Sequence, residues 1–395
     1  MEAYFDNSAT TPVYPEVRDL VVKLMEQDYG NPSSLHQKGV DAARYVSDAR
    51  LSFTWDESIR SYLVDKIARL LKVQAKEIVF TSGGTESNNM ALIGGALANR
   101  RAGNKIITTV VEHASVGSPL TFLEDMGFDV VRIPTGSDGV VDVDRLVDEV
   151  DDDTIIVSVM YVNNEIGAVM PVEDIARRIK EKNPNVLFHV DAIQAFGKYV
   201  IYPKRMGIDM MSISSHKFHG PKGVGALFIK DRVKVKPVIY GGGQQGGMRS
   251  GTENVPGIAG MALAAEMTYR DLDANVAHMR ELKEHLIDEL TQIDDVYSNS
   301  GDAPHIASIT FKGVRSEVML HALEEKGIYV SSGSACSSNK HSTSSTLKAI
   351  GLPPEKLETK LRFSFSPENT MEQIDYAVEC CKELLPMLRR YVRKK

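Results

Sequence analysis

The sequence predicts an α/β fold with two domains. The large domain is expected to have a mainly parallel seven-stranded sheet between helices, and the small one to be a C-terminal α+β domain. The chain has 395 residues, too many for one ordinary hydrophobic core. Short apolar runs alternate with helical patterns through its middle, as in parallel sheets with helical crossovers. From Pro256 to about Ile293 a long helical pattern suits a connector, with proline in its first turn.

The expected elements follow in order. Residues 1–15 are expected to be irregular, a helix should run from about Pro15 to Gln27, and Val40–Leu71 has a mostly helical pattern. The strands of the large sheet should be Ile78–Thr81, Lys105–Thr109, Asp129–Ile133, Thr154–Met160, Val186–Val190, Met210–Ser214 and Val224–Ile229. Helices between them include Glu86–Arg101, Ser115–Asp125 and Val172–Lys182.

The C-terminal part mixes strands and helices in a different order. Its expected elements are strand Ile306–Phe311, helix Ser316–Lys326, a loop, helix Thr343–Ile350, strand Lys360–Ser364 and helix Thr370–Leu388. We therefore expect residues 16–255 to form the large domain. Residues 1–15 and 256–395 should form the small domain with its connecting helix.

Composition and charge argue against several classes of protein. A formal net charge of −7 disfavours a general nucleic-acid binder. No apolar stretch approaches the roughly 20 residues of a membrane span. The N-terminus shows neither a signal-peptide core nor an Arg-rich transit segment, so we expect a cytoplasmic protein without a membrane partner. Three cysteines give no disulfide framework, and no metal site is expected.

One lysine stands at the centre of the candidate site. Met210–Phe228 is typical of strand, loop and strand, and the loop places Lys217 just after an apolar run. An amine made less basic by desolvation or by cationic neighbours can attack a carbonyl and form a Schiff base. Ser214 and His216 are placed to bind a phosphate. A surface lysine in a polar loop is the alternative for this stretch taken alone.

Two more stretches join this lysine. Thr81–Ser87 is a glycine-rich turn between a strand and a helix, where free N–H groups favour an anion such as phosphate. Asp191 follows a buried strand, at the edge where α/β sheets bind ligands. A carboxylate there can keep a heteroaromatic nitrogen protonated, as pyridoxal phosphate requires. Taken singly, these are also consistent with a plain turn and a helix cap.

Together and in this order, the three stretches predict a pyridoxal-phosphate site. His113 follows another strand and is placed to stack on the cofactor ring and exchange protons, although a lone histidine there is more often structural. Cys336 lies among small residues in Ser331–Ser338, where a thiol can swing toward a substrate. An incidental loop cysteine is the alternative.

These motifs carry a specific resemblance that covers nearly the whole chain. The sequence resembles cysteine desulfurases of the NifS/IscS type, within the class V group of fold-type I pyridoxal-phosphate enzymes. The motifs that match in order are Asp6–Pro12, Gly30–Ser34, Thr81–Ser87, Glu112-His113, Asn163–Gly167, Asp191–Gln194, Ser214–Lys217, Arg249–Thr252 and Ser332–Ser337.

The resemblance implies roles for individual residues. Lys217 would form the Schiff base and shuttle the α-proton, and Cys336 would be the nucleophile. Asp191 would pair with the pyridinium nitrogen, Gln194 with the ring oxygen, and His113 would stack on the ring. The remaining expected cofactor and substrate contacts are Gly84 in the cofactor turn, Thr85, Ser214 and His216 at the phosphate with Thr252 of a second subunit, and Asn164 and Arg362 at the substrate carboxylate.

The implied reaction removes sulfur from L-cysteine and leaves L-alanine and a persulfide on Cys336. A homodimer would pass this sulfur to an acceptor protein, such as an iron–sulfur scaffold or a tRNA-thiolation protein. The alternatives are a selenocysteine lyase or an aminotransferase on the same fold, or a silent binding partner. Transamination needs no loop thiol, and a silent protein needs neither Lys217 nor Cys336.

The chain departs from the usual family pattern at three places. The stretch near Leu51–Leu63, which contains Trp55, is about a dozen residues longer than is usual in the family. Gly243–Met248 lacks the usual charged residues, so local dimer contacts are expected to differ. The loop after Cys336 is long, which favours a mobile arm that delivers persulfide to a protein acceptor.

Overall fold

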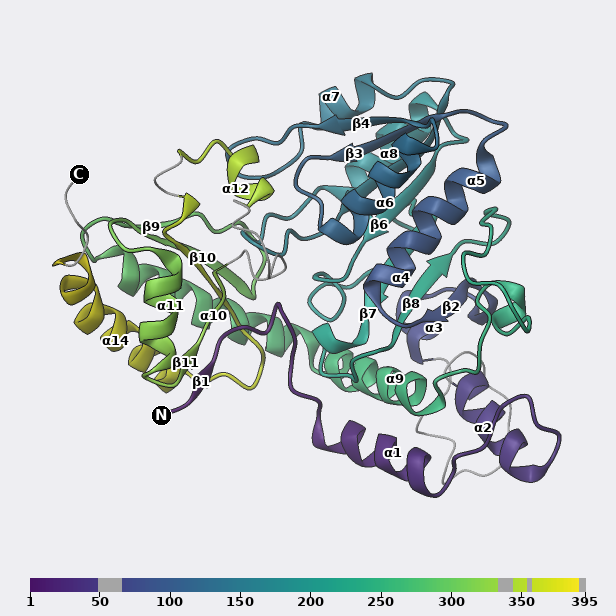
Figure 1. The fold of residues 1–395 in the computed structure, drawn as a ribbon, viewed down its shortest axis with the longest axis horizontal. Coiled ribbons are helices and arrows are strands. Elements are labelled where there is room, and N and C mark those ends of the chain that lie inside the picture. Colours follow the sequence, from purple (N-terminus) through teal and green to yellow (C-terminus); the bar gives the residue numbers. More distant parts are fainter. Residues whose placement is uncertain (49–65, 333–343, 354–356, 391–395) are drawn as a thin grey trace.

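The computed structural model describes residues 1–48, 66–332, 344–353 and 357–390. Figure 1 shows a large sheet flanked by helices on the right and a smaller α+β unit on the left. The predicted segment Leu51–Leu63 and the predicted nucleophile Cys336 lie outside the described residues. Within those residues, no helix has the length and apolar character needed to cross a membrane.

The large sheet has seven strands in the order β2-β8-β7-β6-β5-β3-β4. Their bounds are β2 Ile78–Thr81, β3 Lys105–Thr109, β4 Asp129–Ile133, β5 Thr154–Met160, β6 Leu187–Asp191, β7 Met210–Ser214 and β8 Gly225–Ile229. Strands β4, β3, β5, β6 and β7 pair in parallel, and β8 runs antiparallel to both of its neighbours. The mainly parallel sheet predicted from the sequence is confirmed.

Helices cover the sheet and leave its central strands buried on both faces. All seven residues of β5 are buried, which explains why this strand is a nearly continuous apolar run. The helices before the connector are α1 Pro15–Glu26, α2 Gln37–Asp48, α3 Lys66–Leu71, α4 Gly84–Asn89, α5 Gly95–Asn99, α6 Ala114–Asp125, α7 Val143–Asp148 and α8 Val172–Lys182. A π-helical turn, Met90–Gly94, joins α4 to α5, so the helix is continuous from Gly84.

The smaller unit is built on two short sheets. An antiparallel sheet has the order β12-β10-β9, and a parallel pair joins β1 to β11. The bounds of its elements are β1 Ala3–Tyr4, β9 Val296–Ser298, β10 Ile306–Phe311, α11 Ser316–Glu324, β11 Ile328–Tyr329, α12 Ser345–Ala349, β12 Lys360–Ser364 and α14 Met371–Arg390. The strands β1, β9 and β11 are only two or three residues long, too short to give a recognisable period.

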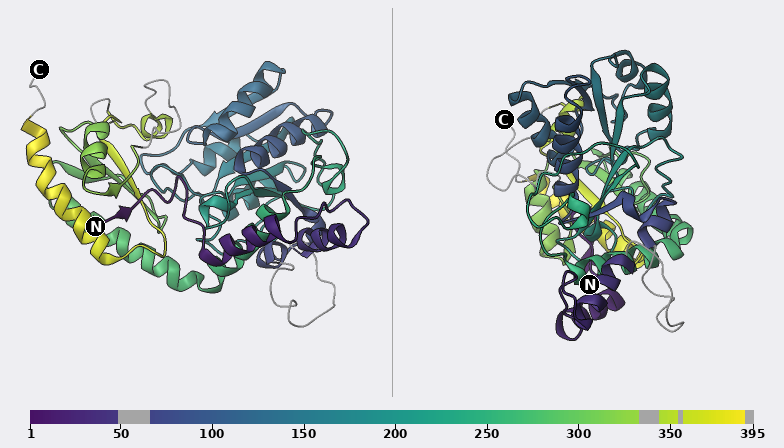
Figure 2. Two further views of the ribbon diagram at one scale, coloured as in Figure 1. Left: turned by 60° about the horizontal axis from the view of Figure 1, so that its bottom comes forward. Right: turned by 90° about the vertical axis from the view of Figure 1, so that its right-hand side faces the viewer.

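The connector differs from the single helix expected. It breaks at Asp271, whose backbone is non-helical, into α9 (Val255–Arg270) and α10 (Leu272–Thr291). The buried side chains of α9 belong to the core of the large sheet, whereas those of α10 pack on the core of the smaller unit. Figure 2 shows the connector spanning both units. We propose the two-domain division predicted from the sequence, residues 16–255 against residues 1–15 and 256–395, with α9 of the connector packed on the large domain.

Candidate active site

Lys217 lies at the carboxyl edge of the large sheet. It ends the short 3-10 turn Ser215–Lys217 that directly follows β7. Its Nζ atom donates to the main-chain carbonyls of Ser8 and Ala9, at 2.6 and 2.7 Å. The amine is therefore directed toward the N-terminal segment, which crosses the edge of the sheet at this point.

Asp191 is the last residue of β6, the strand next to β7. Its side chain is buried, and its Oδ2 atom accepts a hydrogen bond from Asn88 Nδ2 at 2.8 Å. Oδ1 accepts from the amide of Ile193 at 3.0 Å. Burial raises the pKa of Asp191, and these two hydrogen bonds oppose the rise. A positively charged ring nitrogen would favour the ionised carboxylate that this position is shaped to present.

His113 caps the N-terminus of α6 and connects to Asp191 through neutral groups. Its Nδ1 atom accepts from the amide of Ser115 at 3.1 Å, so the proton of the neutral ring is assigned to Nε2. The Ser115 hydroxyl lies 2.8 Å from Nδ1 and accepts from Asn88 at 2.9 Å. Asn88 thereby links the histidine to the carboxylate and fixes both.

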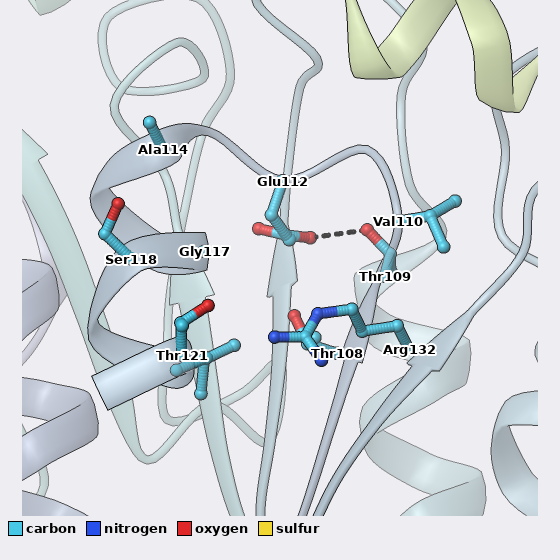
Figure 3. Close-up of a pocket in the computed structure, with 10 residues that line it drawn as sticks. Thr108, Thr109, Val110, Glu112, Ala114, Gly117, Ser118, Thr121 and Arg132 are labelled. Atoms are coloured by element: carbon cyan, nitrogen blue, oxygen red, sulfur yellow. Dashed lines mark hydrogen bonds between the residues drawn. The ribbon is translucent and has the colours of Figure 1, made fainter. Parts of the chain in front are cut away.

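Glu112 precedes this histidine and borders a cleft of about 500 Å³ between β3, β4 and α6. Figure 3 shows its carboxyl group beside Thr109. Oε1 accepts from the Thr109 hydroxyl at 2.7 Å and from the amide of Met160 at 2.9 Å. Oε2 is buried without a partner among the described residues. Burial raises the pKa of Glu112 to about 8, and the nearby charge of Asp191 adds to the rise.

The first turn of α4 can receive a phosphate group. Its cap residue Gly83 has φ +147 and no side chain, so no cap occupies the free amides of the turn. The Ser214 hydroxyl lies 3.7 Å from the place that a Cβ atom on Gly83 would take. Glu86, in the same turn, is held by Arg249 at 2.8 Å and by the amide of Ser82 at 2.8 Å. Its charge is thereby compensated, and the turn fits an anion.

His216 and Thr252 complete the residues predicted for the phosphate. The Nδ1 atom of His216 lies 3.3 Å from the Thr10 hydroxyl. Burial, followed by the charges of Lys217 and Lys222, lowers the pKa of His216 to about 4. His216 is therefore neutral near pH 7 and can act as a hydrogen-bond donor rather than as a cation. Thr252 is exposed in the loop before α9.

Arg362 projects from β12 and is almost fully buried. Its Nη1 atom donates to the carbonyl of Asn164 and its Nη2 atom to Asp6 Oδ1, both at 2.7 Å. The Nε atom is buried without a partner among the described residues. The guanidinium group is thus fixed in place with donor capacity to spare, as a binding group for a carboxylate requires.

The N-terminal segment forms one wall of the site, although the sequence predicted only irregular structure there. The Ser8 carbonyl accepts from both Lys217 and Gln194 Nε2, the latter at 3.0 Å. Asp6, in the same segment, pairs with Arg362. These bonds connect residues more than 180 positions apart, so no local pattern in the sequence reveals them.

The structure thus gathers Lys217, Asp191 and Gln194 around one edge of the sheet. Sequence reasoning did not assign roles to Asn88, Ser115 or Asp6, which hold the predicted residues in place. Asp6 lies inside a motif that the sequence had singled out. Asn88 is a polar residue on the buried face of a helix. Because buried polar side chains are normally hydrogen-bonded, its position in the helical pattern could have indicated a bonded partner in the core.

Comparisons with known proteins show the family of this chain. The family model described as "Aminotransferase class-V" matches residues 3–377. A protein named cysteine desulfurase IscS from Dictyoglomus turgidum is 38% identical over 392 residues, which is 98% of this chain and 95% of that protein. This chain belongs to the class V aminotransferase family, as a cysteine desulfurase of the NifS/IscS type. The pyridoxal-phosphate cofactor expected from the motifs is confirmed with the family.

Other relatives of this desulfurase group cover equally long stretches. A NifS/IcsS protein homolog from Lactobacillus delbrueckii is 40% identical over 388 residues, 96% of each chain. A solved structure described as a NifS-like protein superposes with a TM-score of 0.90 at 36% identity, over 98% of this chain and all of that one. SspA, solved in complex with cysteine, has a TM-score of 0.79 at 33% identity and covers 93% of this chain and all of its own.

Proposed function

We propose that this desulfurase takes the sulfur atom of L-cysteine, releases L-alanine and carries the sulfur as a persulfide on Cys336. The observation that carries the proposal is the arrangement at one sheet edge, where Asp191 ends β6 and Lys217 lies just after the neighbouring parallel strand β7. SspA, a structural relative, has been solved with cysteine bound, which supports the choice of substrate.

The cofactor would be held by groups that the fold already fixes. Lys217 would bind its aldehyde, and the buried Asp191 would keep its ring nitrogen protonated. His113 would lie against the ring, with its proton on Nε2. Gln194 would donate to the ring oxygen from the amide that now bonds Ser8. When bound, pyridoxal phosphate supplies an electron sink for the substrate carbon.

The phosphate would lie on the first turn of α4. Main-chain amides beginning at Gly84 and the hydroxyls of Thr85 and Ser214 would donate to it, and neutral His216 would add another donor. We propose that Thr252 completes the site from a second subunit, because it is exposed rather than directed into its own fold. The functional unit would then be a homodimer.

The substrate carboxylate would bind Arg362, with Asn164 beside it. The Nε atom of Arg362 has no partner among the described residues, and the charge of Asp6 balances the guanidinium until a substrate arrives. A charge-assisted bond of this kind orients the amino acid so that its α-proton faces Lys217. Lys217, as a neutral amine, would accept that proton and return it.

The sulfur step would use Cys336. Its thiolate attacks the substrate sulfur, a sulfur–sulfur bond forms, and the carbon–sulfur bond breaks. The electron pair of the broken bond goes to the substrate carbon, which is later protonated and leaves as alanine. The sulfur atom remains on Cys336 as a persulfide, ready for attack by an acceptor thiol.

We further propose that the acceptor is a protein, such as an iron–sulfur scaffold or a tRNA-thiolation protein, and that the enzyme acts in the cytoplasm. The IscS and NifS names of its relatives support the first choice. The net charge of −7 gives no reason to expect direct contact with nucleic acid.

Borohydride trapping followed by peptide mapping tests the assignment of Lys217. The label should be found on Lys217, and a label on another lysine would refute the site. Cys336→Ser should keep the colour of the bound cofactor but lose sulfide release from cysteine. Full desulfurase activity in this variant would refute the sulfur step and favour another reaction on the same cofactor.

A further inference from the structure

The turn that carries Lys217 is held through its main-chain carbonyl groups. The carbonyls of residues 215, 216 and 218 accept hydrogen bonds from neutral amide or hydroxyl donors. The carbonyl of Lys217 accepts instead from the ammonium group of Lys198, at 2.6 Å. Among the described donors to these four carbonyls, Lys198 is therefore the charged one, and it binds the main chain of Lys217 itself.

Lys198 reaches this carbonyl from the loop after β6, four residues beyond Gln194. It borders a cavity of about 10 Å³, lined also by Thr268, His219 and His305, with room for about one water molecule. Burial, followed by the charge of Lys217, lowers the pKa of Lys198 to about 7. One carbonyl offsets only part of the free energy that it costs to bury an ammonium group. Packing alone therefore does not account for a lysine here.

The two histidines that line the cavity beside Lys198 add no positive charge near Lys217. Burial lowers the pKa of His219 to about 4 and that of His305 well below its usual range, so both rings are neutral near pH 7. The charge of Asp191 attracts the protonated form of Lys217. Repulsion between two ammonium groups is mutual, so the charge of Lys198 disfavours protonation of Lys217.

We propose that Lys198 is a positioning residue for Lys217. Its ammonium group fixes the main chain from which Lys217 projects, and its charge favours the neutral, nucleophilic form of the Lys217 amine. A neighbouring cation is a known way to activate a lysine toward a carbonyl. The inference rests on the proposed role of Lys217 as the lysine that binds the cofactor aldehyde, and it requires no contact between Lys198 and the substrate.

The test is the rate at which the full-length, cofactor-free protein captures pyridoxal phosphate, followed by its colour from pH 6 to pH 9.5. Lys198→Gln keeps a hydrogen-bond donor but loses the charge, and Lys198→Arg keeps the charge. We expect the midpoint of the pH profile to rise by about half a unit in Lys198→Gln, because Lys198, with a pKa of about 7, carries only part of its charge at neutral pH. Capture at pH 7 should then be about threefold slower. The midpoint of Lys198→Arg should stay near that of the wild type.

Lys283 provides the matched control, because it is also a buried lysine whose ammonium group donates to main-chain carbonyls, those of Gly301 and Ala303. Lys283→Gln should leave the midpoint unchanged. An equal shift in this control, or a slower rate in Lys198→Gln at every pH with no shift, would overturn the proposal. If Lys198→Gln is unstable, Lys198→Met gives the same comparison.

The failure of the proposed function can be told from the failure of this inference. Borohydride trapping on the wild-type protein comes first. A label away from Lys217 refutes the role of Lys217 and the inference together. A label on Lys217 with an unmoved midpoint refutes the role of Lys198 alone.

Discussion

Replacing Glu112 with glutamine should remove a pH-dependent loss of stability. The folded protein keeps Glu112 protonated up to a pKa of about 8, whereas an unfolded chain releases this proton near pH 4.5. The folded state therefore binds more protons between these two values, and the free energy of unfolding should fall as the pH rises through this window. Glu112→Gln cannot ionise, so this part of the loss should disappear.

The size of the effect follows from the burial of the carboxyl group. One pKa unit corresponds to about 1.4 kcal/mol, so the full rise to about 8 would correspond to several kcal/mol. Oε2 is enclosed, but the adjacent cleft lets water reach part of the side chain. We therefore expect roughly half of that, about 2 kcal/mol, between pH 5 and pH 9.

Urea unfolding of the cofactor-free protein at pH 5, 7 and 9 measures this difference. Glutamine retains an oxygen for the Thr109 hydroxyl and the amide of Met160, so the fold should be preserved. Glu112→Gln should gain stability over the wild type as the pH rises. The exposed Glu26→Gln, at the end of α1, serves as the control. If both variants differ from the wild type by the same amount at all three pH values, the reasoning is wrong.

Three other predictions test separate parts of the site. Arg362→Gln should raise the KM for cysteine about 100-fold with a smaller change in kcat, because a charge-assisted bond of about 3 kcal/mol is lost; an unchanged KM would place the carboxylate elsewhere. His216→Gln should keep the affinity for pyridoxal phosphate within about fivefold, equally at pH 6 and pH 8, because His216 is already neutral. Equilibrium titrations at the two pH values measure this, and a large loss confined to pH 6 would show that His216 binds as a cation. Lys360→Ala should lower the free energy of unfolding by about 3–5 kcal/mol, because it leaves the carboxylate of Glu165 without its buried ammonium partner. Adding Glu165→Gln to this variant should recover part of the lost stability in urea titrations, and no recovery would contradict the explanation.

Much of the fold was predictable because periodicity is a local signal. The seven strands of the large sheet lie within one residue of their predicted bounds, since each is a short apolar run beside a turn or a helical segment. The break in the connector at Asp271 was not predicted. The pattern of apolar residues continues through it while the buried face changes from one core to the other.

The predicted site divides in the same way. The placement of Lys217 and Asp191 at one edge was predictable, because the ends of neighbouring parallel strands meet there. The sequence did not predict the contacts of Asn88, Glu112 and Lys198, although Glu112 lies in a matched motif. Their roles depend on hydrogen bonds that join distant elements, such as the bond from Asn88 to Asp191 across 103 positions. Polar residues that look ordinary in the sequence become supports for the site once the chain has folded.

The short strand β1 has a practical consequence for anyone who modifies this protein. Ala3 and Tyr4 pair with β11, and within the next five residues the same segment contacts Arg362, Gln194 and Lys217. Deleting about ten residues from the front of the chain would remove a strand, a counter-ion and two carbonyl acceptors at once. An affinity tag at the C-terminus would leave these first residues, which contact the candidate active site, undisturbed.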